Sequence, residues 1–476
     1  MKLAGGIARL ILPSLLLLGC TQAPTLTTSS PEALRLYTEG VSQWENFYYR
    51  EAITSFTDAL AKDSTFAMAW ARLAAVNASS KNQPEALKDI ANAVQYSSRA
   101  TQREQLIIRM WYHRFHYAFN EAAAVADSLI RLYPKEKEGY LVRGNLYETS
   151  KSYDAAIRSY QKAIEADTSY ALAVMSLGYA YSNIGEQEKA LVQMQHYIQM
   201  APLAADPRAS YADLLLRVGR YDEALDQYRK SLELKPDYWY AVNEIGVVYA
   251  VLGRLREAEE QFHASLALLP PSTKLEASHL VADASLNLQR GKEEEAERQC
   301  RDALTQDSSN AGAAISLVDA LARLKRFSQA EDVTERIRQE IERRNLTESP
   351  AMLEFHLMKA RLLRDQGEYE EALGQCKSAL EFSSPLTRGL VYTQISEIRR
   401  REKSYESALD AAEEALQVNP NYPEALLTLL RIYKEKGDDR MTREIGGRLL
   451  DLWKTADPDF QHAIEVRKLL GLRGPA

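Results

Sequence analysis

Apolar residues recur along this chain in paired segments with the spacing of amphipathic helices. In the stretch 239–272, large apolar side chains lie three and four residues apart, as on one buried face of an α-helix. Gly253 interrupts this pattern once, and Pro270 ends it because proline has no backbone N–H and clashes with the preceding turn. We therefore expect one helix near residues 240–252 and a second near residues 255–268.

Small residues occupy two positions in this stretch where a buried face would usually carry large ones. Gly246 and Ala258 are small, whereas Phe262 is large. A small residue opposite a large one allows two antiparallel helices to pack closely. The pattern predicts a tight helix pair whose larger side chains reach into the next pair.

The same pattern recurs in the three preceding stretches, each shifted by about 34 residues. The residues in register are Ala212, Ala224, Tyr228 and Pro236, then Leu177, Gly178, Tyr181, Ala190 and Pro202, and then Gly144, Tyr147, Ala156, Tyr160 and Ala163. This period and these residue types resemble the tetratricopeptide repeat family. The resemblance implies an all-α fold, a right-handed superhelical solenoid of about twelve helix-turn-helix units.

The repeats cover nearly all of the chain after its first 32 residues. Residues 33–272 carry repeats one to seven, and residues 273–456 carry repeats eight to twelve, which are more divergent. Short insertions lie near Ser272 and Asn345. They are either hinges between subarrays or merely longer turns.

The last segment, 457–476, is expected to form a capping helix and a tail. Asp457-Pro458 is typical of a helix start, and Gly471 marks the expected end. A solenoid repeat contacts only its neighbours, so we expect this helix to cover the open end of the array as a polar lid.

Residues 1–19 have the composition of a secretory leader. Lys2 and Arg9 accompany an apolar core that is too short for a membrane span of roughly 17–25 residues. The leader ends in Leu-Leu-Gly before Cys20, which resembles the lipobox of bacterial lipoproteins. That resemblance implies cleavage before Cys20 and lipidation of its thiol. The alternative is an ordinary secretory signal with an unmodified cysteine.

Residues 20–32 would then be the lipidated cysteine and a polar tether. Two or three acyl chains give a lasting attachment, whereas one chain binds a membrane only marginally. The resemblance therefore places the protein on the cell membrane or outer membrane, facing the periplasm or the exterior. Thr21 stands where many lipoproteins of the inner membrane carry aspartate, which favours the outer membrane in a source with two membranes.

By the repeat resemblance, the first helix of each pair lines a concave groove. The aromatic residues at groove positions are Tyr37, Trp44, Trp111, Phe115, Tyr179 and Tyr240, and the polar ones are Asn145, Glu148, Asn183, Asp213, Arg217 and Asn243. Aromatic side chains supply contact area at low entropy cost. This mixture fits an extended peptide or a partner helix. The alternative is that some of the aromatic residues pack between helices as core.

Motifs for catalysis or cofactor binding are missing from the sequence. It contains no GxxxxGK[ST], GxSxG, HExxH or CxxC. His113 and His116 share one helix face, but two ligands alone would bind a metal weakly, so we interpret them as interface or groove residues.

Cys300 and Cys376 occupy the position that Phe262 has in its repeat, where each would be a small core residue. A whole repeat lies between them, which argues against a disulfide. A catalytic thiol is the alternative. We expect a non-enzyme without cofactor or metal.

Charge narrows the class of partner. The chain carries 59 Lys and Arg against 66 Asp and Glu, and removal of the leader would make it more acidic. This balance argues against nucleic acid. The run Arg399-Arg400-Arg401 with Lys403 is either a solvated helix face, which we favour, or a basic patch.

The sequence thus predicts a membrane-anchored scaffold that binds protein or peptide partners in the bacterial cell envelope, in an assembly, secretion or cell-wall complex. The alternative is an envelope sensory or ligand-binding module for a peptide or glycan. The clamp by which co-chaperones of this repeat family bind a carboxyl terminus is not matched, because its positions hold Leu141, Ser176, Asp206 and Ser210.

Overall fold

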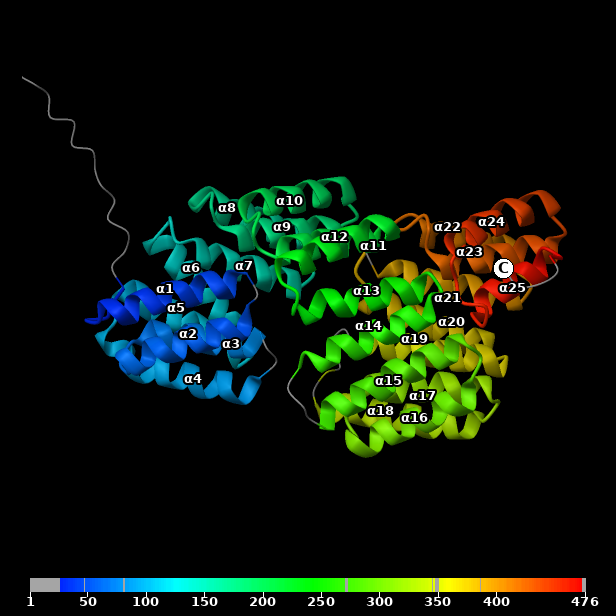
Figure 1. Ribbon diagram of the computed structural model, residues 1–476, viewed down its shortest axis with the longest axis horizontal. Coiled ribbons are helices and arrows are strands. Elements are labelled where there is room, and N and C mark those ends of the chain that lie inside the picture. The colour runs from blue at the N-terminus through cyan, green and yellow to red at the C-terminus, as the bar shows by residue number, and fades with distance from the viewer. Residues whose placement is uncertain are drawn as a thin grey trace, which may run out of the picture. The chain divides into compact units, whose positions relative to one another are not determined.

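A computed structural model of the chain is all-α over the residues that it describes (Figure 1). These residues are 26–46, 48–79, 82–269, 273–344, 346, 351–385 and 387–472, without the side chains of 273–275. The leader, Cys20 and the tether as far as residue 25 lie outside this part of the chain. Within it there are 25 α-helices and no strand, and none of these helices is long and apolar enough to cross a membrane.

The first 24 helices form twelve consecutive pairs, as the periodicity predicted. Repeats one to six are α1 (Pro31–Glu45) with α2 (Tyr49–Lys62), α3 (Ala67–Ser79) with α4 (Gln83–Tyr96), α5 (Gln102–Phe115) with α6 (Phe119–Leu132), α7 (Lys137–Thr149) with α8 (Tyr153–Ala166), α9 (Ala171–Asn183) with α10 (Gln187–Met200), and α11 (Asp206–Arg217) with α12 (Tyr221–Leu234). Repeats seven to twelve are α13 (Trp239–Val251) with α14 (Leu255–Ala267), α15 (Thr273–Gln289) with α16 (Glu293–Gln306), α17 (Ala311–Arg323) with α18 (Phe327–Arg343), α19 (Ala351–Gln366) with α20 (Tyr369–Phe382), α21 (Arg388–Arg401) with α22 (Tyr405–Leu416), and α23 (Pro423–Lys436) with α24 (Asp439–Leu452). A single helix, α25 (Gln461–Leu469), follows.

The described chain divides into two compact units. Unit 1 comprises residues up to Trp44 together with Tyr48–Val125, and unit 2 comprises Glu45–Asn46 and the chain from Ala126 onward. The subdivision expected at Ser272 concerns residues outside the description and stays a prediction.

The helices of repeat seven begin and end within one or two residues of the predicted positions. α13 ends at Val251 and α14 begins at Leu255. Between them, Gly253 adopts a φ of +72°, a left-handed conformation that glycine takes without strain. The glycine therefore ends the first helix and starts the turn, as expected, whereas Pro270 lies outside the described residues.

The predicted pairing of small with large residues is also confirmed. A Cβ atom on Gly246 would lie 2.8 Å from the ring of Phe262, and one on Gly144 would lie 2.3 Å from Tyr160. Both distances are shorter than van der Waals contact, so only glycine permits this approach. Each contact joins the first helix of a repeat to its second helix.

The two described cysteines are core residues. Cys300 and Cys376 are fully buried and carry free thiols, in separate apolar clusters. Burial raises the pKa of each thiol to about 12, so both are neutral at physiological pH. This supports the small-core interpretation and gives neither residue the low pKa of a nucleophilic thiol.

The end of the chain contradicts the expectation that each repeat contacts only its neighbours. Within unit 2, the backbone N–H of Asp457 donates to the carbonyl oxygen of Gly253 at 2.9 Å. Its carboxylate accepts from the backbone N–H of Arg256 at 2.8 Å and from the guanidinium at 2.8 and 3.0 Å. Asp457 therefore satisfies a free donor in the first turn of α14 rather than capping α25, which has Phe460 at its N-cap.

Two further turns extend this junction. Asn421 donates its amide N–H to the carbonyl oxygen of Gly219 at 3.3 Å, and Tyr221 donates to the carbonyl oxygen of Asn421 at 3.2 Å. Gln461 donates to the carbonyl oxygen of Arg290 at 3.1 Å. The turns inside repeats six, seven and eight thus all contact the C-terminal part of unit 2, so the last helix is no lid on an open end.

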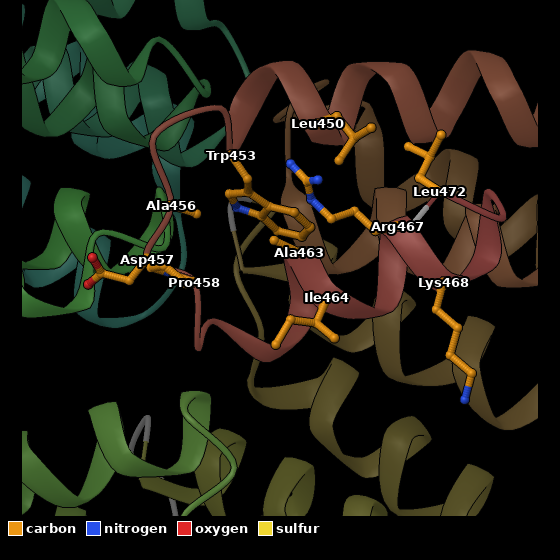
Figure 2. Close-up of a pocket in the computed structure, with 10 residues that line it drawn as sticks. All are labelled: Leu450, Trp453, Ala456, Asp457, Pro458, Ala463, Ile464, Arg467, Lys468 and Leu472. Carbon is orange, nitrogen blue, oxygen red and sulfur yellow. The ribbon is translucent and has the colours of Figure 1, made fainter. Parts of the chain in front are cut away.

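Figure 2 shows a cavity of about 380 Å³ beside this junction, between α24 and α25. Trp453 lines it, and Arg467 of α25 extends toward α24. Asp457 lies at one side, where the chain approaches α13 and α14.

Candidate binding face on the first helices

The predicted polar residues of repeats four to seven converge on one group of helices within unit 2. We define the first-helix face as a set of polar and aromatic residues on α7, α9, α11 and α13. They are Asn145, Glu148, Tyr179, Asn183, Asp213, Arg217, Tyr240, Asn243 and Glu244. The intervening second helices pack against the first helix on either side, which sets the first helices beside one another. Residues one repeat apart in sequence therefore become neighbours in space.

Asp213 of α11 is the centre of this face. Its carboxylate accepts hydrogen bonds from the hydroxyls of Tyr228 at 2.6 Å, Tyr179 at 2.9 Å and Tyr240 at 2.9 Å. These tyrosines belong to α12, α9 and α13, so one side chain ties three repeats together. Burial raises the pKa of Asp213 despite the three donors, because the hydroxyls are neutral and offset only part of the desolvation.

Asp206, at the start of the same helix, makes a second and deeper cluster. It accepts from Tyr238 at 2.9 Å, Tyr197 at 3.0 Å and Ser210 at 3.4 Å. Burial raises its pKa to about 7, with Asp213 adding to the effect. Asp206 is thus a structural carboxyl that is about half protonated near pH 7, and its neighbours again come from three repeats.

Glu148 of α7 extends the face toward repeat four. It accepts from Tyr160 at 2.7 Å and from Asn183 of the next repeat at 3.4 Å. The hydroxyl of Tyr160 lies 2.8 Å from Oδ1 of Asn145 as well. Burial raises the pKa of Glu148, which is opposed only by these uncharged donors.

The other end of the face is formed by α13 and the end of α11. Asn243 donates its amide N–H to Glu244 at 3.1 Å. Burial, reinforced by the charge of Asp213, raises the pKa of Glu244 to about 7. The guanidinium of Arg217 lies 5.5 Å from the ring centroid of Tyr179, over its face.

Glu148, Asp213 and Glu244 are half-buried, and none makes an ion pair with a residue in the described part of the chain.

The structure thus brings together eight of the residues predicted at groove positions, Glu148 and seven others. The seven others are Asn145, Tyr179, Asn183, Asp213, Arg217, Tyr240 and Asn243. Whether they contact a partner stays a prediction. Sequence reasoning missed Glu244 and Tyr238, which lie outside the repeat positions that it sampled, and it considered Asp206 only as a mismatch to the co-chaperone clamp. The spacing of 34 residues between Tyr179 and Asp213 was the available signal for a contact between repeats.

The predicted aromatic residues of unit 1 lie in a different setting. Tyr37, Trp111 and Phe115 are only 5%, 6% and 6% exposed. Trp111 meets Trp44 edge-on with ring centroids 6.3 Å apart and lies 5.5 Å from Phe115. Arg72 donates to the hydroxyl of Tyr37 at 3.2 Å. This burial favours the alternative considered above, in which these three residues pack between helices.

The basic run of α21 is neither a bare patch nor a fully solvated face. Arg400 is mostly buried and pairs with Glu397 at 2.7 Å, as does Arg401 at 3.2 Å, while Arg399 pairs with Glu402 at 2.8 Å. Although burial opposes it, the guanidinium groups around Glu397 lower the pKa of that carboxyl to about 2. The arginines are therefore neutralised within the chain.

His116, one of the two histidines predicted to share a helix face, contacts the backbone of the preceding turn. Nδ1 of His116 lies 2.8 Å from the carbonyl oxygen of Tyr112, one turn earlier. No group of three metal-ligating side chains occurs among the residues that the structure describes.

Comparison with known proteins identifies the repeat. The family model described as Tetratricopeptide repeat matches residues 37–101, 119–171 and 212–273. The chain is a tetratricopeptide repeat (TPR) protein. TPR arrays present extended surfaces to other proteins, so the fold is that of a protein-interaction scaffold.

Relatives match only part of this TPR chain. The small glutamine-rich tetratricopeptide repeat-containing protein 2 of Mycosarcoma maydis is 30% identical over 93 residues, which is 20% of this chain and 26% of that protein. BBSome complex member BBS4 of Bos taurus is 26% identical over 136 residues, 28% of this chain and 25% of that protein. The chain thus spans about a quarter of the length of these curated relatives.

Similar solved structures include a thermophilic TPR protein of Thermus thermophilus. It is 23% identical with a TM-score of 0.34, over 39% of this chain and 99% of that one. Yeast Tom70 is 16% identical with a TM-score of 0.37, over 92% of this chain and 95% of that one.

Proposed function

We propose that this TPR protein is a membrane-anchored scaffold of the bacterial cell envelope that holds partner proteins or peptides against its first-helix face. The observation that carries the proposal is the convergence of Tyr179, Tyr228 and Tyr240 on Asp213. Three repeats share this one carboxylate. These shared hydrogen bonds should hold the face in one arrangement before any partner arrives.

Rigidity matters because binding costs entropy when side chains must be ordered. The tyrosine rings have few rotatable bonds, and their hydroxyls are already fixed by Asp213. Between them, Asn183, Arg217 and Asn243 supply polar groups along the length of the face. An extended peptide or a partner helix could contact several first helices at once.

The charge of the face indicates which partner side chains it would favour. Among the described residues, Glu244 accepts a hydrogen bond only from the neutral amide of Asn243, and burial together with the charge of Asp213 raises its pKa more than Arg217 lowers it. A lysine or arginine of the partner would relieve this unfavourable environment and hold Glu244 in its charged form. We therefore expect a basic side chain near Glu244 in the complex.

The proposed anchor rests on the lipobox resemblance at Cys20 and on the polar tether that follows it. The tether, treated as a flexible coil, reaches roughly 15–20 Å, which would keep the repeats close to the membrane surface. Partners of such a scaffold would themselves belong to the envelope.

The experiment is a crosslinking pull-down of the full-length protein from envelopes. The test variant combines Asn183→Arg with Asn243→Arg, which places bulk and positive charge on the face. The matched control is Gln195→Arg, an exposed position on a second helix. We expect partners that the control retains and the test variant loses.

An identical set of partners in all samples would exclude the first-helix face as the binding site. A complete absence of crosslinked protein, in the unmodified chain as well, would contradict the scaffold and favour the ligand-binding alternative.

A further inference from the structure

A second cavity lies in unit 2, far along the chain from the first-helix face. It occupies about 600 Å³ between the end of α16, α17, α18 and the start of α19. Small-molecule sites in proteins usually have volumes of about 300–1,000 Å³. None of the residues used in the proposed function lines it, so a ligand bound here would be independent of that function.

The floor of this cavity is aliphatic. α18 places Val333, Ile337 and Ile341 four residues apart, so one face of the helix is lined with branched apolar side chains. Ile315 of α17 and Phe355 of α19 line the cavity from the other elements. Such a stripe is about two turns long and suits a single alkyl chain rather than a polar group.

Among the described residues, the rim of the cavity carries more cations than anions. Arg301, Arg336 and Arg344 line the cavity, against Glu340 and Glu354. Arg301 pairs with Glu297 at 2.9 Å, and Arg344 shares Glu340 with Arg343.

Arg336 makes no ion pair with any residue that the structure describes. It is exposed and lies beside Ile337 on the same helix. One positive charge therefore remains available next to the aliphatic floor.

We propose that this cavity binds a fatty carboxylate of about the length of dodecanoate. The alkyl chain lies along Val333, Ile337 and Ile341, and the carboxylate pairs with Arg336. Burial of the methylene groups is favourable, so the alkyl chain supplies most of the affinity. The arginine sets the polarity of the ligand, because a neutral or cationic head group would gain nothing from it.

The test is photo-crosslinking of the full chain by a dodecanoate that carries a diazirine in its alkyl chain, with the labelled peptides located by mass spectrometry. We expect labels on α17 and α18, removed by an excess of dodecanoate but not by dodecylammonium. Labels spread equally over all repeats, or equal competition by both compounds, would overturn the proposal.

Three variants make the test specific. Ala314→Phe fills the cavity and should lower labelling about tenfold, since Ala314 lines it. Arg336→Gln should lower it about two- to fivefold, as expected for one exposed charge pair. The matched control is Arg338→Gln on the same helix, whose guanidinium pairs with Glu335 at 2.6 Å and lies outside the cavity.

Unchanged labelling of Ala314→Phe would place the ligand elsewhere. If that variant fails to fold, Ile337→Asn provides the same test, because it puts a polar amide on the aliphatic floor. Labelling of Ile337→Asn at the original level would then refute the site.

Discussion

The indole N–H of Trp453 donates a hydrogen bond to the carbonyl oxygen of Val251 at 3.0 Å, although 202 residues separate the two in sequence. Val251 is the last residue of α13, where carbonyl groups have no partner inside the helix. A few residues further, Asp457 binds the start of α14 (Figure 2). Both ends of the turn in repeat seven are thus satisfied by the C-terminal segment, which joins distant repeats into one unit.

Asp457→Ala should loosen this junction. The variant leaves the N–H of Arg256 without its acceptor, and loss of such a cap usually costs about 1 kcal/mol. We expect faster hydrogen exchange of the amides from residue 253 to 257. The control is Asp459→Ala. Asp459 makes a long ion pair of 3.8 Å with Arg290 and bonds no backbone N–H in this turn. Equal exchange in both variants would show that the junction does not depend on Asp457.

Gly246→Leu should destabilise repeat seven by overpacking. Even a Cβ at this position would lie 2.8 Å from Phe262, and forcing extra atoms into a packed contact typically costs about 1–3 kcal/mol. Gly374→Leu is the matched control, since nothing lies within 4 Å of a Cβ at that helical glycine. We expect a lower urea midpoint only for Gly246→Leu. A shared midpoint would mean that the contact with Phe262 is absent in solution.

The contrast between Gly246 and Trp453 shows how far the sequence could predict this structure. Gly246 faces Phe262 within one repeat, so a pattern of about 34 residues contains the information. The contact of Tyr179 with Asp213 crosses one period and was partly predictable. The bond from Trp453 to Val251 crosses about six periods and leaves no periodic trace, because it depends on the accumulated geometry of all intervening repeats.

Trp111 illustrates a different limit. Repeat three has Met110 where glycine is usual, and the structure buries Met110 and Trp111 together. A degenerate repeat packs differently from the family pattern. Residues at the family's groove positions, such as Trp111, are therefore buried between helices in repeat three. The face of repeats four to seven was predicted better because its repeats keep the small residues at Gly144, Gly178 and Gly246.

Asp206 should make the stability of unit 2 depend on pH. Burial raises its pKa from 3.8 to about 7 in the folded state, so the folded chain binds this proton more tightly than the unfolded chain. Its contribution to stability is therefore full below about pH 4 and declines as the pH rises through about 7. Glu244, whose pKa is also raised to about 7, acts in the same direction.

The variant that checks this is Asp206→Asn, which cannot ionise. We expect its thermal midpoint to fall less between pH 5 and pH 8 than that of the unmodified chain. Asp226→Asn is the control, because Asp226 is exposed and pairs with Lys230 at 2.6 Å on the surface. If the pH dependence of Asp206→Asn equals that of the unmodified chain, the carboxyl of Asp206 is not desolvated as the structure indicates.

Cys20→Ala should release the protein from membranes, which tests the proposed attachment separately from the binding face. No described helix can cross a bilayer, and the proposed lipid would supply about 0.8 kcal/mol for each buried methylene. We therefore expect the variant in the soluble fraction after a high-salt wash, with the unmodified chain in the membrane pellet. Cys300→Ala is the control, since its thiol is buried in the core and should have no part in attachment. A Cys20→Ala protein that stays in the pellet would require another membrane contact. If that protein left the pellet once substitutions on the first-helix face had removed the crosslinked partners, those partners would be the contact.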